Sequence, residues 1–135
     1  ENDERLLVMA ENDAGGGRYP WYQQGFDLVQ ETPYTFNSPA QIESPESCRP
    51  NRGKPDSPLF QINSWIERIP RDPELAARID ALDPLLERAR LCTRLRGLKP
   101  NLLAVDYYDE GDVLGVANVL NGLAADAEPE VRTTR

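Results

Sequence analysis

Short apolar runs, separated by longer polar and helical stretches, constrain the fold of this chain more than any other feature. Four such runs lie at residues 6–10, 26–30, 58–62 and 102–105. The first and last are apolar throughout, as in a strand that is buried on both faces of a sheet. Because the runs alternate with helical or irregular crossovers, we predict a parallel β/α architecture in which all four are strands.

The stretch between the third and fourth runs has the clearest helical pattern. Asp72 followed by Pro73 is a typical helix start, and apolar residues recur at helical spacing over residues 75–95. Pro84 lies inside this stretch and predicts a kink or a break. A final helix is predicted over residues 112–123.

The segment over residues 35–57 is rich in Pro, Ser, Asn and Gly and reads as a long structured loop, with Cys48 inside it. Loops of this length in compact α/β proteins are usually functional or tied down. We expect residues 1–123 to form one structural unit and residues 124–135 to be a disordered tail.

Charge and hydropathy exclude several classes of partner. The formal net charge is -8, from 23 acidic and 15 basic residues, which argues against nucleic acid and anionic membrane as bulk electrostatic partners. No apolar run approaches the length of a membrane-spanning helix. The sequence opens on Glu1 without a signal peptide, so we expect it to begin inside a longer precursor.

The two cysteines, Cys48 and Cys92, do not form a CxxC motif, and the sequence has no histidine. A structural zinc site is therefore disfavoured. From the residues alone, two interpretations remain open. The cysteines are either free buried thiols or a disulfide that closes a long loop and implies an oxidising compartment.

Polar residues follow each of the four predicted strands. In parallel α/β proteins active sites gather at the carboxyl ends of the strands. Helix caps and turn formers would explain many of these residues equally well. Asp106 is harder to explain in that way, because it directly follows a continuously apolar strand, where an unpaired carboxylate is costly. The residues at the four ends are Glu11, Asn12 and Asp13; Glu31, Thr32, Pro33 and Tyr34; Asn63, Ser64 and Trp65; and Asp106, Tyr107, Tyr108 and Asp109.

Five sequence segments, taken in their order along the chain, indicate a resemblance to a known family. They are LLVMAEN at 6–12, ETPYTF at 31–36, SCRPNRG at 47–53, LFQINSWI at 59–66 and PNLLAVDYYDEGD at 100–112. In these segments the chain resembles the phosphatidylinositol-specific phospholipase C-like phosphodiesterases, in particular their exported bacterial and fungal branch. The resemblance implies a distorted TIM-type β/α barrel, of which residues 1–123 would be the C-terminal half, strands five to eight.

The resemblance also implies a reaction. One histidine acts as general base on the inositol 2-hydroxyl, a second acts as general acid on the leaving group, and the product is a cyclic phosphodiester. Both histidines belong to the first half of the family barrel, so this chain cannot perform that chemistry alone. Asp106 matches the supporting carboxylate that orients the base histidine, against the alternative of a structural ion pair. Many relatives have a histidine where this chain has Ser64.

The remaining expectations follow from the same resemblance. Cys48 and Cys92 are expected to pair, and the protein is expected to be secreted or in the cell envelope. No cofactor is assigned to this chain; calcium stays open, with its usual ligands in the missing half. The partners expected are that N-terminal half and a phosphodiester such as an inositol phospholipid. The side chains expected to contact substrate are Glu11, Tyr34, Asn63, Trp65 and Tyr108.

Two further functional hypotheses remain open. One is a non-catalytic domain of the same fold that binds a carbohydrate or lipid headgroup. The other is a half-barrel that dimerises to cover its open strand edges. Arg52 has two interpretations as well, as a bidentate phosphate ligand or as an anchor of its own loop.

Overall fold

The computed structural model describes residues 6–12 and 17–123. The predicted tail at 124–135 lies outside the described residues. The described strands form two separate sheets, and every strand pair is parallel. β1 (Val8–Ala10) pairs with β2 (Tyr22–Gln24), while β3 (Val29–Glu31), β4 (Leu59–Ser64) and β5 (Leu102–Val105) form a sheet in the order β3-β4-β5.

The predicted half of a TIM-type barrel is therefore wrong, because the strands do not form one continuous sheet. Between β2 and β3 the chain forms a short helix, α1 (Gly25–Leu28), which takes up Phe26, a residue predicted to be in a strand. The edge of β3 that faces away from β4 is occupied by a loop. The Glu31 amide donates to the Arg52 carbonyl at 3.0 Å, and the Asn51 amide donates to the Glu31 carbonyl at 3.0 Å. No strand can pair with β3 where this loop lies.

Gly53 allows the loop to lie so close to β3. Its φ is +88°, a conformation that side chains rarely adopt, and a Cβ there would fall 2.1 Å from the carbonyl oxygen of Val29. The contact between this loop and the sheet therefore depends on the absence of a side chain.

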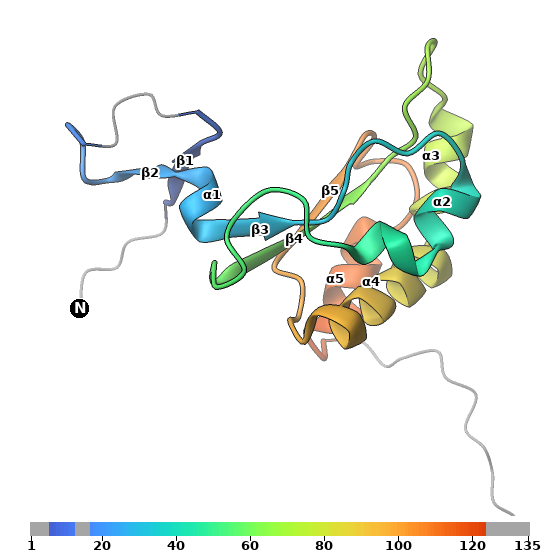
Figure 1. Ribbon diagram of the computed structural model, residues 1–135. Helices are drawn as coiled ribbons and strands as arrows, with labels where there is room; N and C mark the ends of the chain where they lie inside the picture. The colour runs from blue at the N-terminus through green and yellow to red at the C-terminus, as the bar shows by residue number, and fades with distance from the viewer. Residues whose placement is uncertain (1–5, 13–16, 124–135) are drawn as a thin grey trace, which may run out of the picture.

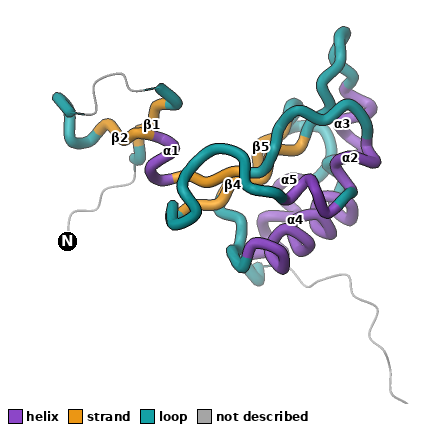
Figure 2. The backbone as a smooth tube through the Cα atoms, in the orientation of Figure 1, coloured by secondary structure: helices purple, strands orange, loops and turns teal. Residues whose placement is uncertain are grey.

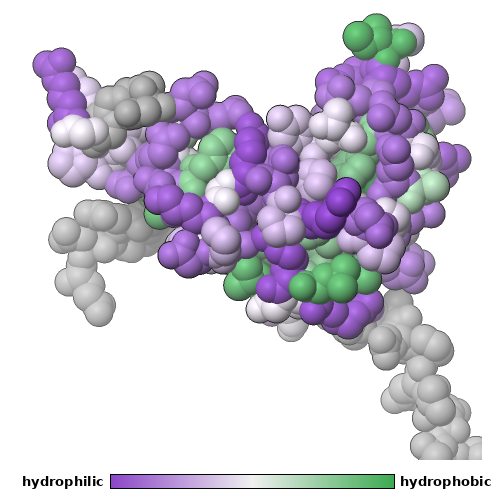
Figure 3. Space-filling view, viewed as in Figure 1, coloured by the Kyte–Doolittle hydropathy of each residue, from purple (hydrophilic) through white to green (hydrophobic). Residues whose placement is uncertain are grey.

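The first strand is also less buried than its sequence predicted. Leu6 is 84% exposed and Leu7 is 53% exposed. In Figure 1 the small β1–β2 sheet lies beside the short helix α1 and stands apart from the helices that follow β3. The face of the molecule drawn in Figure 3 is mainly hydrophilic, with separate small hydrophobic patches.

The helical stretch after β4 is two helices. α3 (Pro73–Ile79) begins at Asp72, whose carboxylate accepts a hydrogen bond from the Leu75 amide at 3.0 Å. α4 (Leu82–Arg96) follows after a break at residues 80–81. Pro84 lies in the first turn of α4, where a missing amide hydrogen costs little, so it causes no kink.

The other helices complete the layer. α4 ends at Gly97, which has a φ of +67°. α5 (Val113–Leu120) begins at Asp112, which caps the Gly115 amide at 2.9 Å. The predicted long loop contains α2 (Pro39–Glu43) and a 3-10 turn, η1 (Pro45–Cys48). None of the helices in residues 6–12 and 17–123 is long and apolar enough to cross a membrane.

The main core lies between one face of the β3–β4–β5 sheet and the helices (Figure 2). Phe60 and Ile62 of β4 point into it and contact Ala89 of α4. The predicted disulfide is confirmed at the same place: Cys48 and Cys92 are bonded, with their sulfur atoms 2.02 Å apart. The bond ties the long loop to α4.

Candidate functional site

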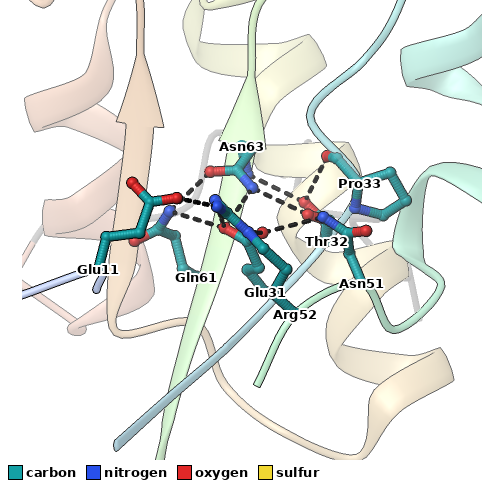
Figure 4. Close-up of polar contacts among 8 residues, drawn as sticks. All are labelled: Glu11, Glu31, Thr32, Pro33, Asn51, Arg52, Gln61 and Asn63. Carbon is teal, nitrogen blue, oxygen red and sulfur yellow. Dashed lines mark hydrogen bonds and ion pairs between the residues drawn. The ribbon is translucent and has the colours of Figure 1, made fainter. Parts of the chain in front are cut away.

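Side chains alternate between the two faces of a strand, so the neighbours of Phe60 and Ile62 point away from the helices. Gln61 and Asn63 of β4 and Glu31 of β3 gather on this second face (Figure 4). With residues from the adjoining loop and from the end of β1, they form what we call the Glu31 cluster. Its members are Glu11, Glu31, Asn51, Arg52, Gln61 and Asn63.

Glu31 is the centre of the cluster and is only 1% exposed. Its Oε1 accepts hydrogen bonds from Arg52 Nε at 2.5 Å and from Asn51 Nδ2 at 2.9 Å. Its Oε2 accepts from Asn63 Nδ2 at 3.1 Å and from Arg52 Nη2 at 3.2 Å. A buried carboxylate needs a cation and several donors to offset the loss of water, and Glu31 has both.

Arg52 connects the cluster to the small sheet and to the aromatic residues. Its Nη1 donates to Glu11, so one guanidinium bridges two carboxylates. The guanidinium also lies over the ring of Phe26, 4.4 Å from the centroid, and over that of Tyr34, at 4.6 Å. The hydrogen bond to Glu31 is the main reason that the pKa of Arg52 lies above its ordinary value. Arg52 therefore fixes its loop through the carboxylates of Glu31 and Glu11, and its interpretation as a phosphate ligand stays a prediction.

We expect Arg52→Ala to lower the free energy of unfolding by about 3 kcal/mol, because Glu31 would be left buried without its cation. This is the lower end of the range for a broken buried pair, since the Arg52 side chain is 36% exposed. Urea denaturation measures the change. Lys54→Ala is the matched control: Lys54 pairs with Asp27 two positions further along the same loop, but both are exposed. Equal destabilisation by the two variants would contradict this account of Glu31.

The predicted substrate-contacting residues lie in different environments. Tyr34 and Trp65 stack with their ring centroids 6.2 Å apart, next to Arg52. Asn63 is fully buried, and its amide donates to the Thr32 carbonyl at 2.8 Å and accepts from Gln61 at 2.7 Å. Tyr108 is 83% exposed on the loop after β5. Their roles toward a substrate stay predictions.

Asp106 lies at the carboxyl end of β5 and is held by Arg71, with Arg71 Nη1 2.7 Å from Asp106 Oδ2. The side chain of Asp106 is 25% exposed, so a quarter of it stays open to solvent. It lines a small hollow together with Trp65, Asp72 and Ile79. Asp106 therefore lies between α3 and the aromatic side of the site.

Behind the carboxyl end of β4 lies a second group of buried polar residues, which was not predicted from the sequence. Asp80 ends α3 and is fully buried, and burial raises its pKa to about 6 despite the neighbouring Ser64 and Arg88. Arg88 of α4 is 4% exposed. Its Nη1 donates to the Asn63 carbonyl at 2.6 Å, which joins the helix layer to the strand end. Burial lowers the pKa of Arg88 to about 10, an effect that the charge of Asp80 partly offsets.

These groups can hold charge, orient a ligand and exclude water, but they offer no general base of the imidazole type, since the chain has no histidine. Within residues 6–12 and 17–123, no cluster of three or more acidic or cysteine side chains is placed to hold a metal ion.

Comparison with known proteins agrees with the resemblance drawn from the sequence segments. The family model described as PI-PLC X 1 matches residues 1–121. The chain is 29% identical to the PI-PLC X domain-containing protein 1 of Arthroderma benhamiae. That match covers 89% of this chain and 42% of the fungal protein, so the chain spans less than half the length of this relative. No solved structure matches the chain. Because the family model covers nearly the whole sequence, this chain belongs to the PI-PLC X family.

Proposed function

We propose that this chain is one part of a phosphodiester hydrolase or lyase of the phosphatidylinositol phospholipase C-like type. It would supply a wall of the active site and a supporting carboxylate, and a companion segment would supply the two histidines. One observation carries the proposal: a chain that belongs to the PI-PLC X family has no histidine and spans 42% of a relative's length. The companion would be another part of the same precursor.

In this proposal Asp106 orients the base. A carboxylate that accepts a hydrogen bond from one imidazole nitrogen fixes the tautomer and stabilises the protonated ring. The base then takes the proton of the attacking hydroxyl, the oxygen attacks phosphorus, and the second histidine protonates the leaving oxygen. Asp106 is available for this role because its present partner, Arg71, is half exposed. A partly exposed pair of this kind is weak, so a histidine can replace Arg71 at small cost.

The substrate in this proposal is a phosphodiester with a sugar-like headgroup, such as an inositol phospholipid. The Tyr34–Trp65 pair offers an aromatic surface on which a ring can stack. Glu11, whose side chain is 61% exposed, can accept hydrogen bonds from ring hydroxyls, and Tyr108 lies on a neighbouring loop. No cofactor is assigned to this chain, and no step of the proposal passes through calcium.

We also propose that the protein functions outside the reducing cytosol, in the cell envelope or as a secreted protein. The Cys48–Cys92 disulfide supports this, because such bonds persist mainly in oxidising compartments.

Reconstitution tests the function. The chain and the separately produced companion segment are mixed and assayed on vesicles that contain phosphatidylinositol, and 31P NMR follows the cyclic phosphate product. We expect activity from the mixture and none from either part alone. Turnover by this chain alone would overturn the proposal. A stable complex that binds vesicles without turnover would instead favour the non-catalytic headgroup-binding domain.

A further inference from the structure

Three buried side-chain oxygen atoms have no hydrogen-bond partner in the part of the chain that the structure describes. They are Ser64 Oγ, Asp80 Oδ1 and Asp80 Oδ2. Ser64 is 1% exposed and Asp80 is 0% exposed. Unsatisfied buried polar atoms are rare in folded proteins, and burial disfavours the anion of Asp80 even though the neighbouring Ser64 hydroxyl acts to lower its pKa. Such groups concentrate where a protein uses the charge state of a side chain.

The charged groups around Asp80 do not neutralise it. The charge of Arg88, on α4, lowers the pKa of Asp80, but the Arg88 guanidinium donates to Ser47 and to the Asn63 carbonyl. Asp106, beyond β5, raises the pKa further by charge repulsion and is itself bound by Arg71. Burial is the largest cause, and together these effects bring the pKa to about 6.

The main chain of Asp80 holds the loop that carries Asp106. The Asp80 carbonyl accepts a hydrogen bond from the Asp112 amide at 2.9 Å, at the start of α5. Gly111, with a φ of +80°, lies against the same carbonyl, and a Cβ there would be 2.6 Å from the Asp80 oxygen. The loop over residues 106–112 thus starts at the supporting carboxylate and ends on Asp80.

We propose that Asp80 is a positioning residue for Asp106 and that Asp80 acts through the loop over residues 106–112. With Asp80 neutral, the loop closes on the end of α3 and Asp106 stays beside Arg71. With Asp80 charged, the buried anion draws in water, repels Asp106 and loosens the contact with Asp112. The importance of Asp106 rests on the proposed function, but the coupling between the two carboxyls does not require it.

The test is a pH titration of the chain alone, with 13C-labelled aspartate carboxyls observed by NMR. We expect the Asp106 signal to show an inflection near pH 6 that disappears in Asp80→Asn. Because coupling is reciprocal, Asp106→Asn should move the midpoint of Asp80 to lower pH. Asp109→Asn, on the same loop, is the control and should change neither. An Asp106 signal with no inflection near pH 6, or one that Asp80→Asn leaves unchanged, would overturn the inference.

Stability gives a second readout. A carboxyl whose pKa is higher in the folded than in the unfolded chain stabilises the protein below the unfolded value of 3.8 and loses that contribution as the pH rises to about 6. We expect the folding equilibrium constant of the wild type to fall relative to that of Asp80→Asn by up to about tenfold per pH unit over this interval. Parallel pH profiles for the two proteins would overturn the assignment of a buried acid.

The two proposals can fail separately. An inactive reconstituted mixture with an intact inflection would end the proposed function and leave the coupling in place. An active mixture in which Asp80→Asn leaves the Asp106 signal unchanged would end the coupling and leave the proposed function in place.

Discussion

Asp106→Asn is expected to lower the turnover of the reconstituted enzyme by about 10²–10⁴-fold while the fold is kept. An asparagine has nearly the same shape, but it cannot hold the imidazole in the required tautomer or stabilise its protonated form. The loss should lie mainly in kcat, because the orienting carboxylate acts on the reacting histidine and not on the bound headgroup. Steady-state kinetics on phosphatidylinositol vesicles measure it, and circular dichroism checks the fold.

Asp109→Asn is the matched control for this experiment. Asp109 is exposed on the loop that follows β5, three positions beyond Asp106, so its loss should leave turnover unchanged. If Asp106→Asn keeps wild-type turnover across the pH range, the Asp106–Arg71 ion pair is a structural contact and the supporting role fails.

Replacing both cysteines in a Cys48→Ala, Cys92→Ala variant is expected to lower the free energy of unfolding by about 4 kcal/mol. The bond joins residues 44 positions apart, and a loop of that length accounts for about 4 kcal/mol of chain entropy in the unfolded state. Both residues are also buried against Phe60 and Ile62, so the substitution removes core contacts as well. Denaturant unfolding with and without reductant separates the cross-link from the packing.

Thr93→Ala, next to Cys92 on α4, serves as the control for local effects on the helix. It removes only a hydroxyl that donates to the Ala89 carbonyl at 2.8 Å. A loss below about 1 kcal/mol for the double cysteine variant would show that the long loop is held by other contacts, such as those of Arg88 and Arg96.

The local features of the fold could be predicted from the sequence better than the long-range ones. Residues 58–62 and 102–105 are close to the observed β4 and β5, because buried strands leave a clear apolar signal. Phe26 was assigned to a strand because its neighbours Leu28 and Val29 continue an apolar run. The helix α1 that it joins is too short to show a period. The break that Pro84 predicted lies at residues 80–81, just before the first turn of α4, although apolar spacing continues across it.

The failure of the barrel prediction has a physical cause that local sequence does not show. Nothing in the residues around Gly53 indicates that this loop lies against β3, since the contact depends on a backbone conformation and on hydrogen bonds between distant segments. The same holds for the site. Glu31 follows a predicted strand and could be suspected, whereas Asp80 lies in a helical pattern and becomes unusual only once its burial is known.

The loop at Asn51 and Arg52 covers one edge of the three-stranded sheet, so that a further strand could pair only at the other edge. One margin of the sheet is closed by the chain's own backbone, whereas the outer margin of β5 has no strand partner among the described elements. Any strand added by a companion or by a second copy would therefore have to align beside β5, next to Asp106. If a companion pairs with this sheet, it would lie at the edge that ends in Asp106, the carboxylate of the proposed reaction.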